Sequence, residues 1–144
     1  KDTVFAGLEK ARGNLEVRGA LTIIDTNASG TITTADDIVF NLATAAGGFP
    51  VLVDPSATTN SVVVNYIDAE DRVADATYTV NEIQGDGDNL LENGELFEIT
   101  VNPPGTSTLV ANEIFTLEVV PPQGGTLLIE RTMPPELDVV MDLH

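Results

Sequence analysis

The sequence predicts an all-β fold, an antiparallel β-sandwich or barrel of the immunoglobulin-like or jelly-roll-like kind, with about eight strands and a short N-terminal helical stub. Short segments with apolar residues at every second position recur along the chain, whereas a helical period occurs only near the N-terminus. Clusters of Gly, Pro and Asn separate these segments. The chain has 144 residues, of which 42% are hydrophobic, and this suffices for one packed core.

Residues 1–14 are predicted to be the C-terminal end of a longer helix. Gly13 followed by Asn14 is a helix stop, and a helix of about twelve residues is marginal alone. The alternative is a short terminal helix that packs on the body of the protein. Four of the six basic residues lie in the first eighteen positions, and this change in charge marks a boundary near Gly19. The apolar residues at helical spacing are Val4, Leu8, Ala11 and Leu15.

From Leu15 onward the apolar period changes to two, and residues 15–144 are predicted to form one β-domain. The segment 38–46 is ambiguous, because its Ala-rich end favours a helix while its β-branched start favours a strand. The stretch 137–143 is either a further strand or an extended tail. The remaining predicted strands are 15–23, 49–53, 61–67, 76–83, 96–101, 114–120 and 126–132.

Composition excludes several classes of protein. The chain has 6 Lys and Arg against 23 Asp and Glu, for a net charge of −17. Such a balance excludes an ordinary nucleic-acid-binding protein and argues against docking on anionic lipid. The absence of Cys excludes disulfide scaffolds and thiolate zinc sites. The single His, His144, excludes a His-based triad and a multi-His metal site.

The sequence also contains no catalytic motif, and we predict that the protein is not an enzyme. It has no Gly-x-Ser-x-Gly nucleophile turn and no phosphate-binding Gly-x-x-x-x-Gly-Lys loop. A pair of carboxylates could hydrolyse glycosides, since that chemistry needs only two of them at the right separation. With so many acidic residues some pair always meets this condition, so the pattern has no specificity.

The Gly-rich acidic loop 85–95 is the most informative segment. Hard cations such as Ca²⁺ take six to eight oxygen ligands from side chains and backbone carbonyls, and glycine lets the chain wrap around the ion. We therefore expect a structural Ca²⁺ or Mg²⁺ site here. Its candidate ligands are Asp86, Asp88, Leu90, Glu92 and Glu95.

This loop is not an EF-hand. Asp86 and Asp88 have the spacing of its first two ligands, but Leu91 stands where that loop needs Gly and Phe97 where it needs Glu. The alternative to a metal site is a solvated acidic turn, with Asn93-Gly94 as a tight hairpin turn. A second acidic run, residues 68–71, could lend a ligand if the two loops meet, although a charged loop that protects strand edges is the simpler interpretation.

One glycosylation sequon is present. Asn27-Ala28-Ser29 is the only Asn-x-Ser/Thr in the chain, and it lies in a predicted turn, where an acceptor must lie. A pattern of three residues is weak by itself, and it gains weight only if the protein is exported.

Several segments together resemble archaeal flagellins (archaellins). Residues 4–9 and 14–19 look like the region just after the hydrophobic N-terminal helix of that family. Residues 91–99 resemble its Leu-x-x-Gly-Glu strand. Residues 115–119 and 125–135, with the order apolar-Glu-Arg-Thr-x-Pro near their end, are similar to its C-terminal block.

The resemblance implies a structural subunit of an extracellular motility filament, the archaellum, in which identical subunits assemble into a helical homopolymer. Residues 1–144 would then be the outer β-domain with the hydrophobic N-terminal helix removed. No membrane contact and no self-assembly are expected of this trimmed chain. The family also implies N-glycosylation at Asn27 and a bound metal in the outer domain.

Two other functions stay open at this point. The first is an exported β-sandwich adhesin or surface binding module, although the few aromatic residues count against sugar binding. The second is a small hydrolase that uses carboxylates. If the filament interpretation holds, like-charged subunits repel, and cations at their contacts could be needed for assembly.

Overall fold

The computed structural model describes residues 14–33, 35–104 and 108–143. The helical stub predicted for residues 1–14 lies outside these residues, apart from Asn14. The described chain contains β-strands and no helix, which confirms the all-β prediction. The strands are β1 (Leu15–Ile24), β2 (Asp37–Thr44), β3 (Val51–Leu52), β4 (Val63–Ile67), β5 (Arg72–Val73), β6 (Tyr78–Gln84), β7 (Leu90–Leu91), β8 (Leu96–Val101), β9 (Ile114–Val120), β10 (Leu127–Thr132) and β11 (Val140–Leu143).

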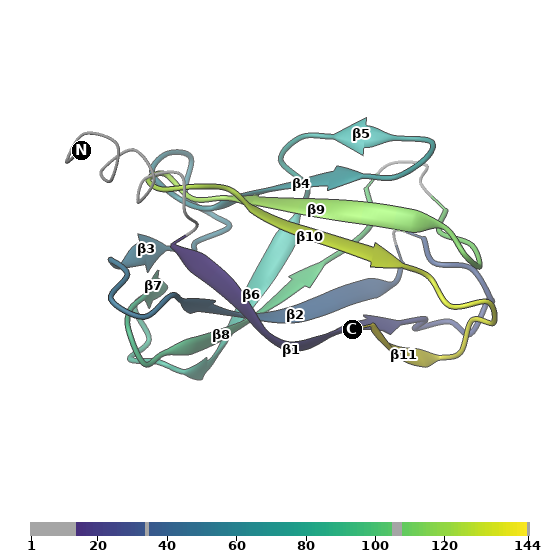
Figure 1. The fold of residues 1–144 in the computed structure, drawn as a ribbon, viewed down its shortest axis with the longest axis horizontal. Coiled ribbons are helices and arrows are strands. Elements are labelled where there is room, and N and C mark those ends of the chain that lie inside the picture. Colours follow the sequence, from purple (N-terminus) through teal and green to yellow (C-terminus); the bar gives the residue numbers. More distant parts are fainter. Residues whose placement is uncertain (1–13, 34, 105–107, 144) are drawn as a thin grey trace, which may run out of the picture.

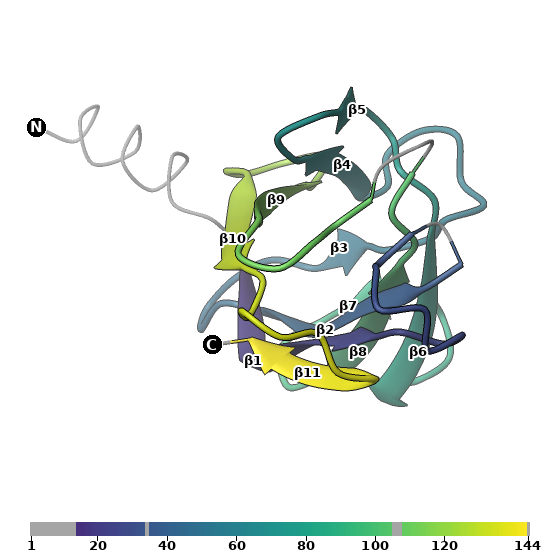
Figure 2. The same ribbon diagram turned by 90° about the vertical axis from the view of Figure 1, so that its right-hand side faces the viewer.

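The strands form a two-layer sandwich. A five-stranded sheet has the order β11-β1-β2-β8-β6, a four-stranded sheet has the order β10-β9-β4-β5, and β3 pairs with β7 in a small third sheet. The strand pairs of the described residues are antiparallel. Figure 1 shows the two large sheets as layers one above the other, and Figure 2 shows the same layers from the side.

The hydrophobic core lies between the two large sheets, because alternate residues of each strand point inward. In β8 of the five-stranded sheet, Phe97, Ile99 and Val101 are buried while their neighbours are half-buried. The period-two pattern of this segment in the sequence is therefore confirmed. The opposing sheet contributes Tyr66, Phe115, Leu117, Val119 and Ile129, among others.

Both segments whose structure the sequence left ambiguous contain strands. The ambiguous segment 38–46 lies mostly in β2, which pairs with β1 on one side and β8 on the other. Two ladders of hydrogen bonds outweigh the helical preference of its alanines. The stretch 137–143 ends in β11, which pairs with Leu21–Ile24 of β1 and so is partly a strand rather than only an extended tail.

Two strands carry local irregularities. The change in charge near Gly19 falls inside β1, the strand predicted from Leu15 onward; Gly19 has a φ of 77° and lies where the pairing with β2 shifts between Arg18 and Thr22. A second bulge between Glu82 and Gln84 shifts the pairing of β6 with β8. Ile83 lies at this second bulge, on the outward face of β6, and is 52% exposed.

Asn14 fixes the start of β1 against the turn that follows β2. Its Nδ2 donates to the Phe49 carbonyl at 2.8 Å, and its Oδ1 accepts from the Phe49 N–H at 3.0 Å. The Asn14 carbonyl accepts from the Ala45 N–H at 2.7 Å. The Asn14 side chain thus both donates to and accepts from the backbone of Phe49, as a residue of a neighbouring strand would.

No helix among the described residues is long and apolar enough to cross a membrane.

Candidate metal centre

Four carboxylates gather where the chain passes from β6 through β7 to β8. One carboxylate oxygen from each of Asp86, Asp88, Glu92 and Glu95 lies within 4.8 Å of the others. Oxygens bound to a single Ca²⁺ at about 2.3–2.6 Å are at most about 5 Å apart. The spacing of this group, called the acidic cluster below, therefore fits one ion, and four of the five predicted ligands are brought together.

The backbone of the cluster bends at two residues with positive φ, Gly87 (83°) and Asn89 (57°). Glycine and asparagine tolerate this left-handed conformation better than other residues. Glu82 holds the bend, because its two carboxylate oxygens accept from the Gly87 N–H at 3.1 Å and from the Asn89 N–H at 3.3 Å. No pattern in the sequence indicates Glu82, which shapes the loop without belonging to the cluster.

A tight turn brings the second pair of carboxylates to the first. The Glu95 N–H donates to the Glu92 carbonyl at 3.1 Å, and Glu95 Oε1 accepts from the Glu92 N–H at 2.9 Å. Gly94, with a φ of 84°, allows the reversal. The turn predicted at Asn93-Gly94 is present, but it is not a hairpin turn, because β7 pairs with β3 while β8 pairs with β2 and β6.

A hydrogen bond between Asp86 and Asp88 changes the ionisation of both side chains. The hydrogen bond with Asp88, then desolvation, then the charges of Asp88, Glu95 and Glu92 raise the pKa of Asp86 to about 6. The hydrogen bond with Asp86, followed by the bond from the Leu90 N–H, lowers the pKa of Asp88. The two carboxylates therefore share a proton in mildly acidic solution, and a cation would take the place of that proton.

The fifth predicted ligand, Leu90, could contribute only its backbone carbonyl. Leu90 pairs with Leu52 of β3, and its N–H donates to Asp88 Oδ1 at 3.0 Å. The acidic run 68–71 supplies no member of the cluster found among the described residues. It forms the turn between β4 and β5, where Asp68 accepts a hydrogen bond from the Tyr66 hydroxyl at 2.7 Å.

The predicted glycosylation site lies elsewhere. Asn27 is an exposed residue of the loop between β1 and β2. This loop and the acidic cluster lie at opposite ends of the long axis of the molecule (Figure 1). An exposed loop satisfies the steric requirement of a glycan acceptor, and the presence of a glycan stays a prediction.

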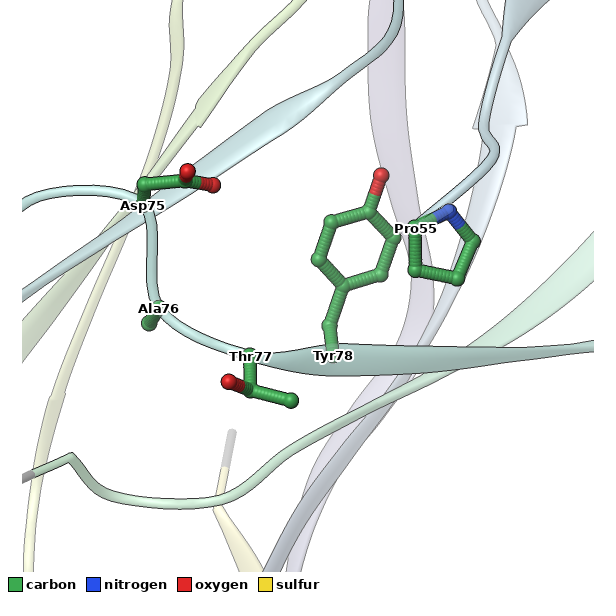
Figure 3. A pocket seen from close by; sticks show the side chains of 5 residues that line it. All are labelled: Pro55, Asp75, Ala76, Thr77 and Tyr78. Carbon is green, nitrogen blue, oxygen red and sulfur yellow. The ribbon is translucent and has the colours of Figure 1, made fainter. Parts of the chain in front are cut away.

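A shallow surface pocket of about 200 Å³ lies beside the start of β6. Figure 3 shows the Tyr78 ring, the ring of Pro55 and the turn at Asp75 around it. Sites for small molecules typically enclose about 300–1,000 Å³. The Tyr78 hydroxyl donates to the Val62 carbonyl at 2.6 Å, so this tyrosine serves to hold the fold together.

Comparisons with known proteins agree with one another. The model of the archaeal-type flagellin family matches residues 1–131. No curated protein sequence matches the chain significantly. Among solved structures, the archaeal flagellin FlaB1 from Methanocaldococcus jannaschii is similar with a TM-score of 0.69 and 14% identity, over 90% of this chain and 95% of that chain.

Two further structures share the fold. The archaeal flagellum of Methanospirillum hungatei strain JF1 is similar with a TM-score of 0.67 and 16% identity, over 99% of this chain and 77% of that one. The archaellum periplasmic stator protein complex FlaF and FlaG from Sulfolobus acidocaldarius has a TM-score of 0.50 and 18% identity, over 85% of this chain and 92% of that chain. At these identities the structures establish a common fold only.

Proposed function

The chain belongs to the archaeal-type flagellin family, and from this membership we infer that it is a structural subunit of the archaellum filament. The protein is extracellular, and its partners are identical subunits in a helical homopolymer. The family match over residues 1–131 carries this conclusion, since it spans β1 to β9 and most of β10. The adhesin alternative has no support.

Such a subunit needs no catalytic apparatus, and we propose that the protein has no enzymatic activity. Its function lies in a stable β-sandwich and in the surfaces that contact neighbouring subunits. The pocket beside Tyr78 is smaller than a typical small-molecule site.

The acidic cluster is proposed to hold a structural Ca²⁺ or Mg²⁺. The convergence of four carboxylates supports this proposal, because without a cation they repel one another. Six to eight oxygens suit Ca²⁺ better than Mg²⁺, which demands a near-ideal octahedron. Asn27 is proposed to carry an N-glycan, supported by its sequon and its exposure.

Labelling intact cells of the source organism tests the filament assignment. Antibodies raised against residues 14–143 should decorate the surface filaments along their whole length in immunogold electron microscopy. Peptides of this chain should also dominate the mass spectrum of sheared, purified filaments. Labelling confined to the cell envelope, with filaments made of a different protein, would contradict the assignment and favour a stator role like that of the Sulfolobus complex.

A further inference from the structure

The loop between β1 and β2 carries a second pattern of oxygen-bearing residues. The two strands pair last at Ile24 and Asp37, so the described residues 25–33, 35 and 36 belong to the loop between them. Its sequence is Asp-Thr-Asn-Ala-Ser-Gly-Thr-Ile-Thr-Thr-Ala-Asp. The twelve-residue EF-hand loop takes ligands from positions 1, 3, 5, 7, 9 and 12 and has Gly at position 6. Those positions are occupied here by Asp25, Asn27, Ser29, Thr31, Thr33 and Asp36, with Gly30 at the sixth.

The loop departs from the EF-hand pattern at two ligand positions. Ser29 stands where Asp or Asn is usual, and Asp36 stands where the pattern has Glu. Both replacements keep an oxygen ligand. Strands flank the loop in place of helices, so the resemblance is confined to residues 25–36.

The described backbone turns sharply at the position where such a loop needs a turn. Gly30 has a φ of 80°, which makes the sharp turn at position 6. The Gly30 N–H donates to Asp25 Oδ2 at 2.8 Å, and the Ser29 N–H donates to Asp25 Oδ1 at 3.1 Å. These bonds fold the chain around the first carboxylate.

Several prospective ligand oxygens already lie close together. Ser29 Oγ is 3.5 Å from Asp25 Oδ1 and 2.9 Å from the Thr31 carbonyl oxygen. Thr33 Oγ1 is 3.4 Å from Asp36 Oδ2. Neighbouring oxygens around a Ca²⁺ ion, with bonds of about 2.3–2.6 Å, are about 3–4 Å apart.

The two carboxylates are buried without a basic partner. Asp25 is 2% exposed and Asp36 is 0% exposed. Among residues 14–33, 35–104 and 108–143, the salt bridges within 4.0 Å involve other acids, Glu16 and Glu118. Backbone N–H groups partly offset the charge, since Asp36 accepts from Thr26 at 2.9 Å and Thr33 at 2.8 Å. Buried charges are usually paired or bind a metal.

Contacts outside the loop keep its ends in place. Ile32, at position 8, pairs with Leu109 through two backbone hydrogen bonds of 3.1 and 2.8 Å. The Asp25 N–H donates to the Val139 carbonyl at 2.8 Å, and Asn102 Nδ2 donates to the Asp36 carbonyl at 2.8 Å. The loop is therefore preorganised rather than shaped only by a ligand.

We propose that the loop between β1 and β2 binds one Ca²⁺ ion, with Asp25, Asn27 Oδ1, Ser29, the Thr31 carbonyl, Thr33 and Asp36 as the ligand set. An N-glycan is attached through Nδ2 of Asn27 and leaves Oδ1 free to bind the ion. This site is separate from the acidic cluster, which lies at the other end of the sandwich (Figure 1). Only two of its ligands are charged, so its affinity falls in the range of extracellular calcium modules, about 10⁻⁴ to 10⁻³ M. A bound ion there would join β1, β2 and the start of β11.

Isothermal titration with CaCl₂ tests the proposal on the full chain, produced without glycosylation and stripped with EDTA. The background is the double variant Asp86→Asn/Asp88→Asn, which disables the acidic cluster. In this background we expect about one Ca²⁺ bound per chain. Asn27→Ala should raise Kd on the order of tenfold, because it removes one ligand, whereas Gln123→Ala, a change in another exposed amide, should leave Kd unchanged.

A gain of affinity makes the test independent of folding defects. Ser29→Asp restores the usual residue at position 5 and adds a charged ligand, so Kd should fall on the order of tenfold. Retention of Ca²⁺ binding in the double variant, tightened by Ser29→Asp and weakened by Asn27→Ala, supports the site. No binding in the double variant, with none gained by Ser29→Asp, would overturn it, whatever the acidic cluster binds in the parent chain.

Discussion

At the scale of single residues, the acidic cluster contains more negative charge than its own contacts offset. Asp86 gains a proton far more readily than an ordinary carboxyl, with a pKa raised to about 6 by Asp88 and the neighbouring glutamates. The negative charge of Asp86 should therefore destabilise the metal-free protein, whereas it should stabilise the metal-bound protein.

Replacing Asp86 with Asn tests that opposition. In EDTA, Asp86→Asn should raise the unfolding temperature, because one of four clustered charges is removed. With Ca²⁺ in excess, the same variant should gain less stability than the parent, because a ligand is lost. Thermal unfolding by circular dichroism measures both. Asp138→Asn, at an exposed acid, is the matched control; equal shifts in the two variants would contradict a local effect.

The two tyrosines give a prediction at high pH. Burial raises the pKa of Tyr66, as does its hydrogen bond to Asp68, and burial likewise raises the pKa of Tyr78. Below the ordinary pKa of about 10 both rings are neutral whether folded or unfolded. Above it only the unfolded chain loses these protons, so the free energy of unfolding should fall as pH rises.

The ultraviolet absorbance of the phenolate reports this directly, since these are the only tyrosines in the chain. Phenolate should appear together with the loss of the far-ultraviolet β-signal in a single transition. A titration near pH 10 in which the fold is retained would show that at least one ring is accessible to hydroxide.

Residue patterns in the sequence predicted part of the candidate sites. The four acidic-cluster carboxylates were found because they lie within one short loop of sequence. Glu82 was not, because its contacts with Gly87 and Asn89 depend on the bulge at the end of β6. The oxygen-bearing residues from Asp25 to Asp36 overlap the sequon at Asn27, and only the close approach of Ser29 to Asp25 and of Thr33 to Asp36 shows that they form pairs.

At the scale of elements, alternation predicted the strands well and their interruptions poorly. β8 and β9 bury every second residue, as their sequences indicate. The bulges at Gly19 and Ile83 arise from the pairing of β1 with β2 and of β6 with β8, which no local pattern encodes. The Asn-Gly pair likewise predicted the chain reversal at Gly94, but it could not indicate how the strands on either side of the turn are paired.

β8 is an interior strand of the five-stranded sheet, between β2 and β6, and its inward-facing side chains belong to the core. Phe97 is 0% exposed in a strand that pairs on both sides. Phe97→Ala should lower the free energy of unfolding by about 3–5 kcal/mol, from lost burial and the cavity left behind. Urea denaturation measures the loss. Ile83→Ala, at a side chain 52% exposed on the neighbouring strand, should cost less than about 1 kcal/mol; a cost similar to that of Phe97→Ala would contradict the assigned core.

At the scale of the whole molecule, net charge dominates. A chain with a net charge of −17 repels itself when folded and repels identical neighbours in a filament. Only three basic residues lie in the described part of the chain, at positions 18, 72 and 131. Composition alone excludes nucleic acid and anionic lipid as partners of this acidic chain. Identical subunits are identified as its partners only by the family match.

Salt should therefore stabilise the protein in two separable ways. NaCl should raise the unfolding temperature gradually by screening, and the acidic-cluster charges should contribute to that rise. CaCl₂ at equal ionic strength should add several degrees more once its concentration is about 100 times Kd. Differential scanning calorimetry of EDTA-stripped protein separates the two. Identical curves in the two salts would show that cations act only by screening.

The geometry of β1 determines how the domain would bear a mechanical load. Tension directed along β1 from Leu15 acts perpendicular to the hydrogen bonds that join β1 to β2 and β11. Those bonds are strained together in shear rather than peeled apart one by one. The tie between Asp25 and Val139 anchors the far end of the strand. A pull along β1 would thus be resisted by all of these bonds at once, a property suited to a filament that turns under viscous drag.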